Sequence, residues 1–254
     1  MAGHSKWANI KRQKARVDAV KGKVFAKLSR EIIVAAKQGG GDPDGNFQLR
    51  TAIDKAKAAG VPNDNIDRAI AKGSGKLGSD GDLESIRYEG YGPGGVAVLV
   101  EALTDNRNRT AADLRTAFSK NGGNLGETGC VGWMFGQKGV VVVMGELDED
   151  ALLEAAIEGG AESYELTEVD EDTPGAEVFC PPSDLETLSE HLKIESYTVK
   201  EIEVRWVPSN TVDVTDTDQA KSLLKMMDAL EDLDDVQSVT ANFDIGEEML
   251  ATFF

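Results

Sequence analysis

The sequence predicts a multidomain α+β protein, in which an N-terminal three-helix domain is followed by two ferredoxin-like α/β domains, one inserted in the other. Three observations predict this class. The chain has 254 residues, which is more than one domain usually holds. Apolar residues recur at helical spacing up to residue 73, and they alternate with a period of two beyond residue 82. A stretch rich in Gly and Ser at 73–81 separates the two patterns and is typical of a linker.

The first domain is predicted to span residues 1–81 as a basic arm, three helices and the linker. Residues 1–20 carry many Lys and Arg and few large apolar side chains. We therefore expect an arm, or a helix that orders on its target. Apolar residues at helical spacing over 24–36 predict the first helix, and the Gly-rich stretch 39–45 ends it.

Two shorter helices complete this domain. The second helix is predicted over residues 47–59, with Gly60 closing it. The third helix follows Pro62, takes Asn63 as its N-cap and stops at Gly73. Short turns between three amphipathic helices indicate a small all-α domain.

Strand patterns begin after the linker. Residues 86–91 and 96–103 alternate as paired strands around the turn 92–95. Residues 110–113 resemble a capping box that opens a helix ending near Asn121. A further strand is predicted over 131–135.

The middle of the chain contains a complete βαββαβ order, which defines a ferredoxin-like unit. Its predicted elements are strand 140–144, helix 148–158, strands 163–169 and 176–180, a helix capped by Ser183 with Glu186, and strand 198–207. One helix near 220–230 and one strand at 236–243 remain, which is too little for a domain. The two strands and the helix predicted before residue 137 are also too few for a domain, and these two elements complete them. We therefore predict an inserted domain, 138–207, within a discontinuous domain of 82–137 and 208–254.

Charge is unevenly distributed along the chain. Residues 1–37 contain ten Lys or Arg against Asp18 and Glu31, a net charge of +8, whereas the whole chain carries −18. The remaining residues, 38–254, therefore carry −26. Such segregation favours a polyanion as the partner of the positive end.

A solvated helix face is the ordinary explanation of a charge run. Here we favour nucleic acid, because the cations have almost no acidic neighbours in sequence and aromatic residues are interleaved with them, as in surfaces that stack on bases. The predicted nucleic-acid-binding residues are Lys6, Trp7, Lys11, Arg12, Lys14, Arg16, Lys21, Lys23, Lys27 and Arg30.

The polar loop 105–109 is a possible second contact, through Arg107 and Arg109. Two arginines in an otherwise acidic half of the chain suit an RNA or a protein surface. The alternative is a turn with an Asx cap before Thr110, and the sequence does not separate the two.

Other classes of function have little support in the sequence. The longest apolar run, 140–144, has the length of a strand and not of a membrane span. The basic N-terminus lacks the apolar segment of a signal peptide, so we expect a cytoplasmic protein without a membrane partner. Residues 90–95 match GxGxxG, but Pro93 lies inside and a strand follows, which favours a hairpin turn.

No catalytic residue, metal ligand, cofactor or small-molecule substrate is predicted. The two histidines, His4 and His191, have no neighbours at zinc-ligand spacing. Cys130 and Cys180 lack a CxxC pattern, and we expect reduced thiols. The chain is therefore expected not to be an enzyme.

Six long motifs resemble the YebC/PmpR family. They are AGHSKWANIK at 2–11, GGGDP at 39–43, NIDRAIAKG at 65–73, YEGYGPGG at 88–95, TDNRNRT at 104–110 and AFSKNGGNLG at 117–126. The chain departs from the family pattern at Gln13 and Val17, where basic or small residues are more usual. The region 146–172 is also more acidic than the family pattern.

The resemblance implies an N-terminal helical domain, two α/β domains and a non-enzymatic cytoplasmic regulator. Members are described as probable transcriptional regulatory proteins that bind promoter DNA. Mitochondrial relatives are translational activators of cytochrome c oxidase, and bacterial relatives are linked to stalled ribosomes. The expected partner is therefore DNA or ribosomal RNA, and the ribosome itself in the second case.

Three hypotheses follow. The first is a nucleic-acid-binding regulator resembling the family's DNA-binding members. The second is a translation factor that binds the ribosome, which suits Lys and Arg that position a protein without reading sequence. The third is a protein-interaction module that uses the acidic α/β domains.

Overall fold

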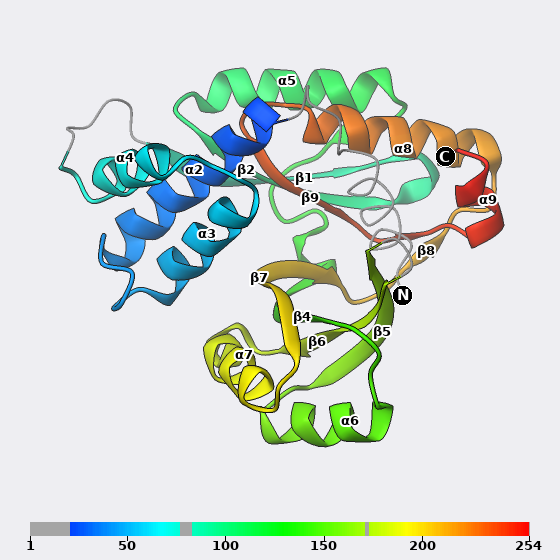
Figure 1. Cartoon of the computed structure of the whole chain (residues 1–254). Coiled ribbons are helices and arrows are strands. Elements are labelled where there is room, and N and C mark those ends of the chain that lie inside the picture. Colours follow the sequence, from blue (N-terminus) through cyan, green and yellow to red (C-terminus); the bar gives the residue numbers. More distant parts are fainter. Residues whose placement is uncertain (1–20, 77–82, 171–172, 254) are drawn as a thin grey trace. The chain divides into compact units, whose positions relative to one another are not determined.

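The computed structural model describes residues 21–76, 83–170 and 173–253 (Figure 1). Within them, contacts gather into two compact units. One is residues 135–207, and the other combines the described residues before 135 with those from 208 onward. The predicted class is confirmed, since a helical N-terminal part is followed by mixed α/β sheets. The boundaries of the three predicted domains stay a prediction.

Three helices form the N-terminal part of the larger unit: α2 (Lys21–Gly39), α3 (Phe47–Ala58) and α4 (Asn63–Gly73). Their apolar faces meet in one core, as the helical periodicity predicted. Its fully buried members include Leu28, Ile32, Ala36, Leu49, Ile53, Ala56, Val61, Ile66 and Ala69. The N-cap of α4 is Pro62 and makes no side-chain cap bond, so the predicted Asn63 cap is wrong and Asn63 is the first helical residue.

Buried Asn46 joins these helices. Its side chain caps α3 by accepting a hydrogen bond from the Leu49 N–H at 3.1 Å. Its amide also donates to the carbonyl oxygens of Ala35 and Gly40, both at 2.9 Å. Gly39 allows this approach, because a Cβ there would lie 2.5 Å from the Asn46 amide.

A four-stranded sheet forms the rest of the larger unit, in the order β3-β1-β2-β9. The strands are β1 (Glu84–Tyr91), β2 (Ala97–Thr104), β3 (Asn124–Leu125) and β9 (Val236–Ala241). β2 is antiparallel to both β1 and β9, and in the first pair Gly90 lies opposite Val98. The last strand of this sheet therefore comes from beyond residue 207.

Two helices, α5 (Arg107–Lys120) and α8 (Thr217–Glu231), run along one face of this sheet (Figure 1). A Cβ on Gly90 would lie 2.8 Å from the Phe118 ring of α5, and one on Gly92 would meet Met226 of α8. The even-numbered positions of β1 thus face the helices. Because side chains alternate along a strand, Arg87, Glu89 and Tyr91 lie on the opposite face.

The inserted unit contains β4 (Phe135–Met144), α6 (Glu149–Glu158), β5 (Ser163–Asp170), β6 (Thr173–Cys180), α7 (Leu185–Ile194) and β7 (Thr198–Pro208). This is the predicted βαββαβ order. Its sheet has the order β5-β6-β4-β7. The smaller elements β8 (Val212–Asp213), β10 (Phe243–Asp244) and α9 (Glu247–Ala251) were not predicted.

Besides the Asn63 cap, three local predictions are wrong. Helix α5 begins at Arg107 under an Asn106 cap, so Thr110 lies inside it and opens no capping box. Residues Gly132–Met134 form a 3-10 turn, η2, where a strand was predicted. Ser183 lies in another 3-10 turn, Pro182–Asp184, and α7 has no side-chain cap bond.

Candidate nucleic-acid interface

The predicted basic residues divide into two groups. Lys6, Trp7, Lys11, Arg12, Lys14 and Arg16 lie outside the described residues. Lys21 is the first residue of α2, and Lys23, Lys27 and Arg30 follow in the same helix. Spacings of four and three residues place the last three cations in one stripe along α2.

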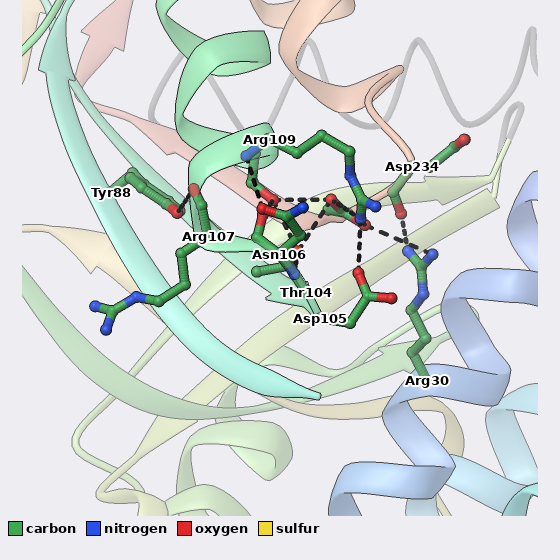
Figure 2. Close-up of polar contacts among 10 residues, drawn as sticks. Arg30, Tyr88, Thr104, Asp105, Asn106, Arg107, Arg109 and Asp234 are labelled. Atoms are coloured by element: carbon green, nitrogen blue, oxygen red, sulfur yellow. Dashed lines mark hydrogen bonds and ion pairs between the residues drawn. The ribbon is translucent and has the colours of Figure 1, made fainter. Parts of the chain in front are cut away.

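This stripe contacts the segment 231–235, which we call the acidic turn and which contains Glu231, Asp232, Asp234 and Asp235. Lys23 Nζ donates to the Asp232 carbonyl oxygen at 3.1 Å, and Lys27 Nζ donates to the Glu231 carbonyl oxygen at 2.7 Å. Arg30 donates to the Asp234 carbonyl oxygen, and its Nη2 lies 3.7 Å from Asp235 Oδ1 (Figure 2).

The acidic turn is electrostatically suited to hold cations. It includes the C-terminal end of α8, where the last carbonyl groups lack helical partners and the helix dipole is negative. The carboxylate side chains of the same segment place full negative charges near these carbonyl groups. The α2 stripe therefore holds an array of oxygen atoms with negative charge, and phosphate oxygens offer the same chemistry to Lys and Arg.

Asp235 is the buried member of the acidic turn, with 7% of its surface exposed. Its Oδ2 accepts hydrogen bonds from Thr110 at 2.8 Å and Thr104 at 3.2 Å, and Arg109 Nη2 donates to both carboxylate oxygens. Burial opposes its ionisation, but the hydrogen bonds from Arg109 and Thr110 outweigh burial, so the pKa of Asp235 is lowered.

The two arginines of the predicted second contact differ in their surroundings. Arg109 bonds Asp235 and also Asp105, at 2.9 Å. Arg107 lies nearer to solvent, with 69% of its side chain exposed and its Nε 3.6 Å from a Glu84 carboxylate oxygen. The Asn106 side chain between them accepts from the Arg109 N–H at 3.1 Å and caps α5, as the Asx-cap alternative predicted. Arg109 thus stabilises the fold, and Arg107 is the better placed of the two for a partner.

The acidic turn was not among the predicted site residues. Its partners lie on α2 and at the start of α5, more than 120 residues earlier in the chain. The available signal was the run of four acidic residues directly after an amphipathic helix, which alone is typical of a solvated surface.

Within the described part of the chain, no group of three or more His, Cys, Asp or Glu is arranged to hold a metal ion. Both cysteines are free thiols, and burial raises the pKa of Cys180 to about 11. No described helix is both long and apolar enough to cross a membrane.

Two family models match the chain. The "TACO1/YebC protein N-terminal domain" matches residues 5–76, and the "TACO1/YebC second and third domain" matches residues 83–243. Curated relatives share this similarity over their whole length. A "probable transcriptional regulatory protein" of Gloeothece citriformis is 68% identical over 252 residues, covering 99% of this chain and 98% of that protein. One of Trichormus variabilis is 69% identical over all of both chains.

A solved structure agrees with the fold. The crystal structure of a conserved hypothetical protein from Aquifex aeolicus aligns with a TM-score of 0.86 at 47% identity. The alignment covers 96% of this chain and 99% of that one. The family models, the relatives and the solved structure all extend over nearly the whole chain, and they agree with the six motifs of the sequence. The chain belongs to the TACO1/YebC family, known also as YebC/PmpR.

Proposed function

We propose that this protein is a non-enzymatic, nucleic-acid-binding regulator of gene expression that acts in the cytoplasm. The basic arm and the stripe on α2 bind phosphates, and the stripe does so in competition with the acidic turn that contacts it within the chain. The observation that carries the proposal is the stripe of Lys23, Lys27 and Arg30, which already binds three backbone carbonyl oxygens and lies beside two carboxylates within the chain. The relatives named as transcriptional regulatory proteins support the same class of function.

Two nucleic acids are candidates. The names of the relatives favour promoter DNA and transcriptional control. The charge distribution favours ribosomal RNA. Residues 38–254, which are strongly acidic, are repelled by long duplex DNA. On a ribosome, the basic arm alone can enter a cleft in the RNA while the acidic residues stay outside it. Lys and Arg on phosphates position a protein and carry no sequence information, which also suits the ribosome.

The test is binding of the intact protein to purified ribosomes and to duplex DNA, side by side across a salt series. Tight ribosome binding together with weak, sequence-blind DNA binding identifies a translation factor. A preference for particular DNA sequences that persists as salt rises identifies a transcriptional regulator, because non-specific phosphate contacts weaken steeply with salt. Binding to neither at low salt contradicts the proposal.

A further inference from the structure

One large aromatic side chain of the larger unit is mostly exposed to solvent. Trp133, in the turn Gly132–Met134, is 73% exposed. Tyr91, at the end of β1, is 37% exposed. Exposed tryptophans are costly to leave in water, and they commonly mark surfaces that bind a partner.

Both aromatic side chains donate a hydrogen bond to the same carbonyl oxygen. Trp133 Nε1 donates to the Cys130 carbonyl oxygen at 3.3 Å, and Tyr91 Oη donates to that oxygen at 3.1 Å. The polar atom of each ring is therefore satisfied within the chain. What the pair offers to a ligand is ring surface, which suits stacking better than hydrogen-bonded recognition.

A buried carboxylate holds the turn that carries this carbonyl. Glu89 is 1% exposed, and its Oε2 accepts hydrogen bonds from the N–H groups of Val131 at 2.8 Å and Gly132 at 2.6 Å. Gly132 leaves room for this carboxylate, because a Cβ there would lie 2.9 Å from Glu89 Oε1. The carbonyl group that both rings contact thus belongs to a turn that hydrogen bonds within the chain hold in place without a ligand.

A cation lies on the same face of the sheet, two strand positions from Glu89 and four from Tyr91. Arg87 occupies the same face of β1 as Glu89 and Tyr91, and its Nε is 3.7 Å from Glu89 Oε1. The side chain of Arg87 keeps 41% of its surface exposed. Aromatic rings with a neighbouring Arg are the combination by which proteins bind single-stranded nucleic acid, stacking on bases while the cation meets phosphate.

We infer that Trp133 and Tyr91 form a stacking site for unpaired bases of single-stranded nucleic acid. The inference rests on the proposed function, since the basic residues of the arm and α2 supply the phosphate contacts that bring the strand to the protein. Bases inside a duplex are stacked on each other and are not available to an exposed indole. The site therefore selects single strands and does not bind duplex.

The experiment uses the full chain and a fluorescent oligouridylate, with a duplex of the same length as comparison. Trp133→Leu should weaken oligouridylate binding by about 5- to 100-fold, the range that loss of one stacked base produces. The same variant should leave duplex binding unchanged. Trp133→Phe keeps an aromatic ring and should retain most of the affinity. Because Trp133 is exposed, urea unfolding of both variants should match that of the wild type.

A second measurement uses the fluorescence of the Trp133 side chain itself. In a chain that carries Trp7→Phe and Trp206→Phe, Trp133 is the remaining tryptophan, and its fluorescence should be quenched when oligouridylate is added. Unchanged fluorescence at saturating oligouridylate would overturn the stacking site.

The outcomes separate this inference from the proposed function. If Trp133→Leu binds oligouridylate like the wild type, while neutralising Lys23, Lys27 and Arg30 abolishes binding, the stacking site is wrong and the proposed function stands. If Trp133→Leu loses affinity for ribosomes only, and not for oligouridylate, Trp133 contacts a protein and the inference is again wrong. If the wild type binds no nucleic acid at low salt, both fail together.

Discussion

The carboxylate of Asp235 joins three segments that are far apart in the sequence. It accepts from Thr104 at the end of β2 and from Thr110 and Arg109 in α5, and it faces Arg30 of α2. Removing this acceptor is expensive, because the buried hydroxyl groups of Thr104 and Thr110 lose a partner without gaining water.

Asp235→Ala should lower the free energy of unfolding by about 1–3 kcal/mol, because the hydroxyl groups of Thr104 and Thr110 lose a buried acceptor. Urea unfolding monitored by circular dichroism measures this. Asp234→Ala is the matched control: the Asp234 side chain is exposed, and Arg30 bonds its backbone carbonyl, which the substitution keeps. Equal stability of the two variants would contradict a structural role for the Asp235 carboxylate.

The lowered pKa of Glu89 makes the free energy of unfolding depend on pH. Burial opposes its ionisation, but hydrogen bonds from the N–H groups of Val131, Gly129 and Gly132 outweigh burial and lower its pKa in the folded chain. A carboxyl whose folded pKa is lowered stabilises the fold above its ordinary pKa, near 4, and this contribution is lost as the pH falls through the lowered value.

Glu89→Gln should therefore unfold at lower urea than the wild type at pH 7, and the difference should shrink steadily below about pH 4. Unfolding midpoints of both chains across a pH series measure the effect. A difference that stays constant down to pH 2 would show that ionisation of Glu89 contributes nothing to the turn at 129–132.

At the scale of elements, cations of α2 contact the acidic turn, and under the proposed function nucleic acid competes for the same cations. The oxygens that Lys23, Lys27 and Arg30 hold within the chain occupy the same donors that would meet phosphates. Binding of nucleic acid and docking of the acidic turn on α2 therefore oppose each other.

Glu231→Gln, Asp232→Asn and Asp234→Asn together should tighten nucleic-acid binding by about two- to ten-fold at low salt, because three negative charges beside the stripe are removed while its hydrogen bonds to backbone carbonyls remain. Fluorescence anisotropy with a labelled oligonucleotide measures the change. The control, Glu154→Gln, Glu165→Gln and Glu190→Gln, changes the net charge equally at exposed positions of the inserted unit. An equal gain in both variants would mean that total charge, and not the contact with α2, sets the affinity.

Elements with strong periodicity were predictable from the sequence, and their ends were not. The predicted strands at 86–91 and 96–103 and the helices of the N-terminal part match the structure within a few residues. The cap of α5 was misplaced, because Asn106 and Thr110 are both good N-caps and only the tertiary bond from Thr110 to Asp235 decides between them. The strand predicted over 131–135 failed because buried Glu89 draws the N–H groups of Val131 and Gly132 to itself.

The positive charge of the candidate site could be predicted from the sequence, but the residues that its cations contact could not. The density of Lys and Arg before residue 38 follows from composition alone. The partners of Arg30 and Arg109 do not, since Asp235 lies 205 and 126 positions away in the chain. Trp133 was not predicted for the same reason: its exposure depends on a turn that a distant strand residue holds.

At the scale of the whole molecule, a chain with a net charge of −18 has one basic segment, residues 1–37, with a net charge of +8. Binding that depends on this end should be strongly salt-dependent, because each neutralised phosphate releases a counterion. Neutralising Lys11, Arg12, Lys14 and Arg16 together should weaken binding by orders of magnitude and flatten the slope of log affinity against log salt by about 3–4.

A salt series with the wild type and this variant measures both quantities. The comparison variant neutralises Lys57, Arg68, Lys72 and Lys76, four exposed cations in and after α3 and α4, and should change the slope less. Full-strength binding by the arm variant would place the phosphate contacts elsewhere on the chain.

The pairing of β2 with β9 also sets an order of events during synthesis. The hairpin of β1 and β2 leaves the ribosome long before β9, because the whole inserted unit is translated between them. At ordinary elongation rates this interval lasts roughly ten seconds. Throughout that time the acidic turn does not yet exist, and the cations of α2 emerge without their intramolecular partner. A nascent chain of this protein is thus exposed to nearby polyanions, including the ribosome that makes it, before the finished molecule covers its own positive surface.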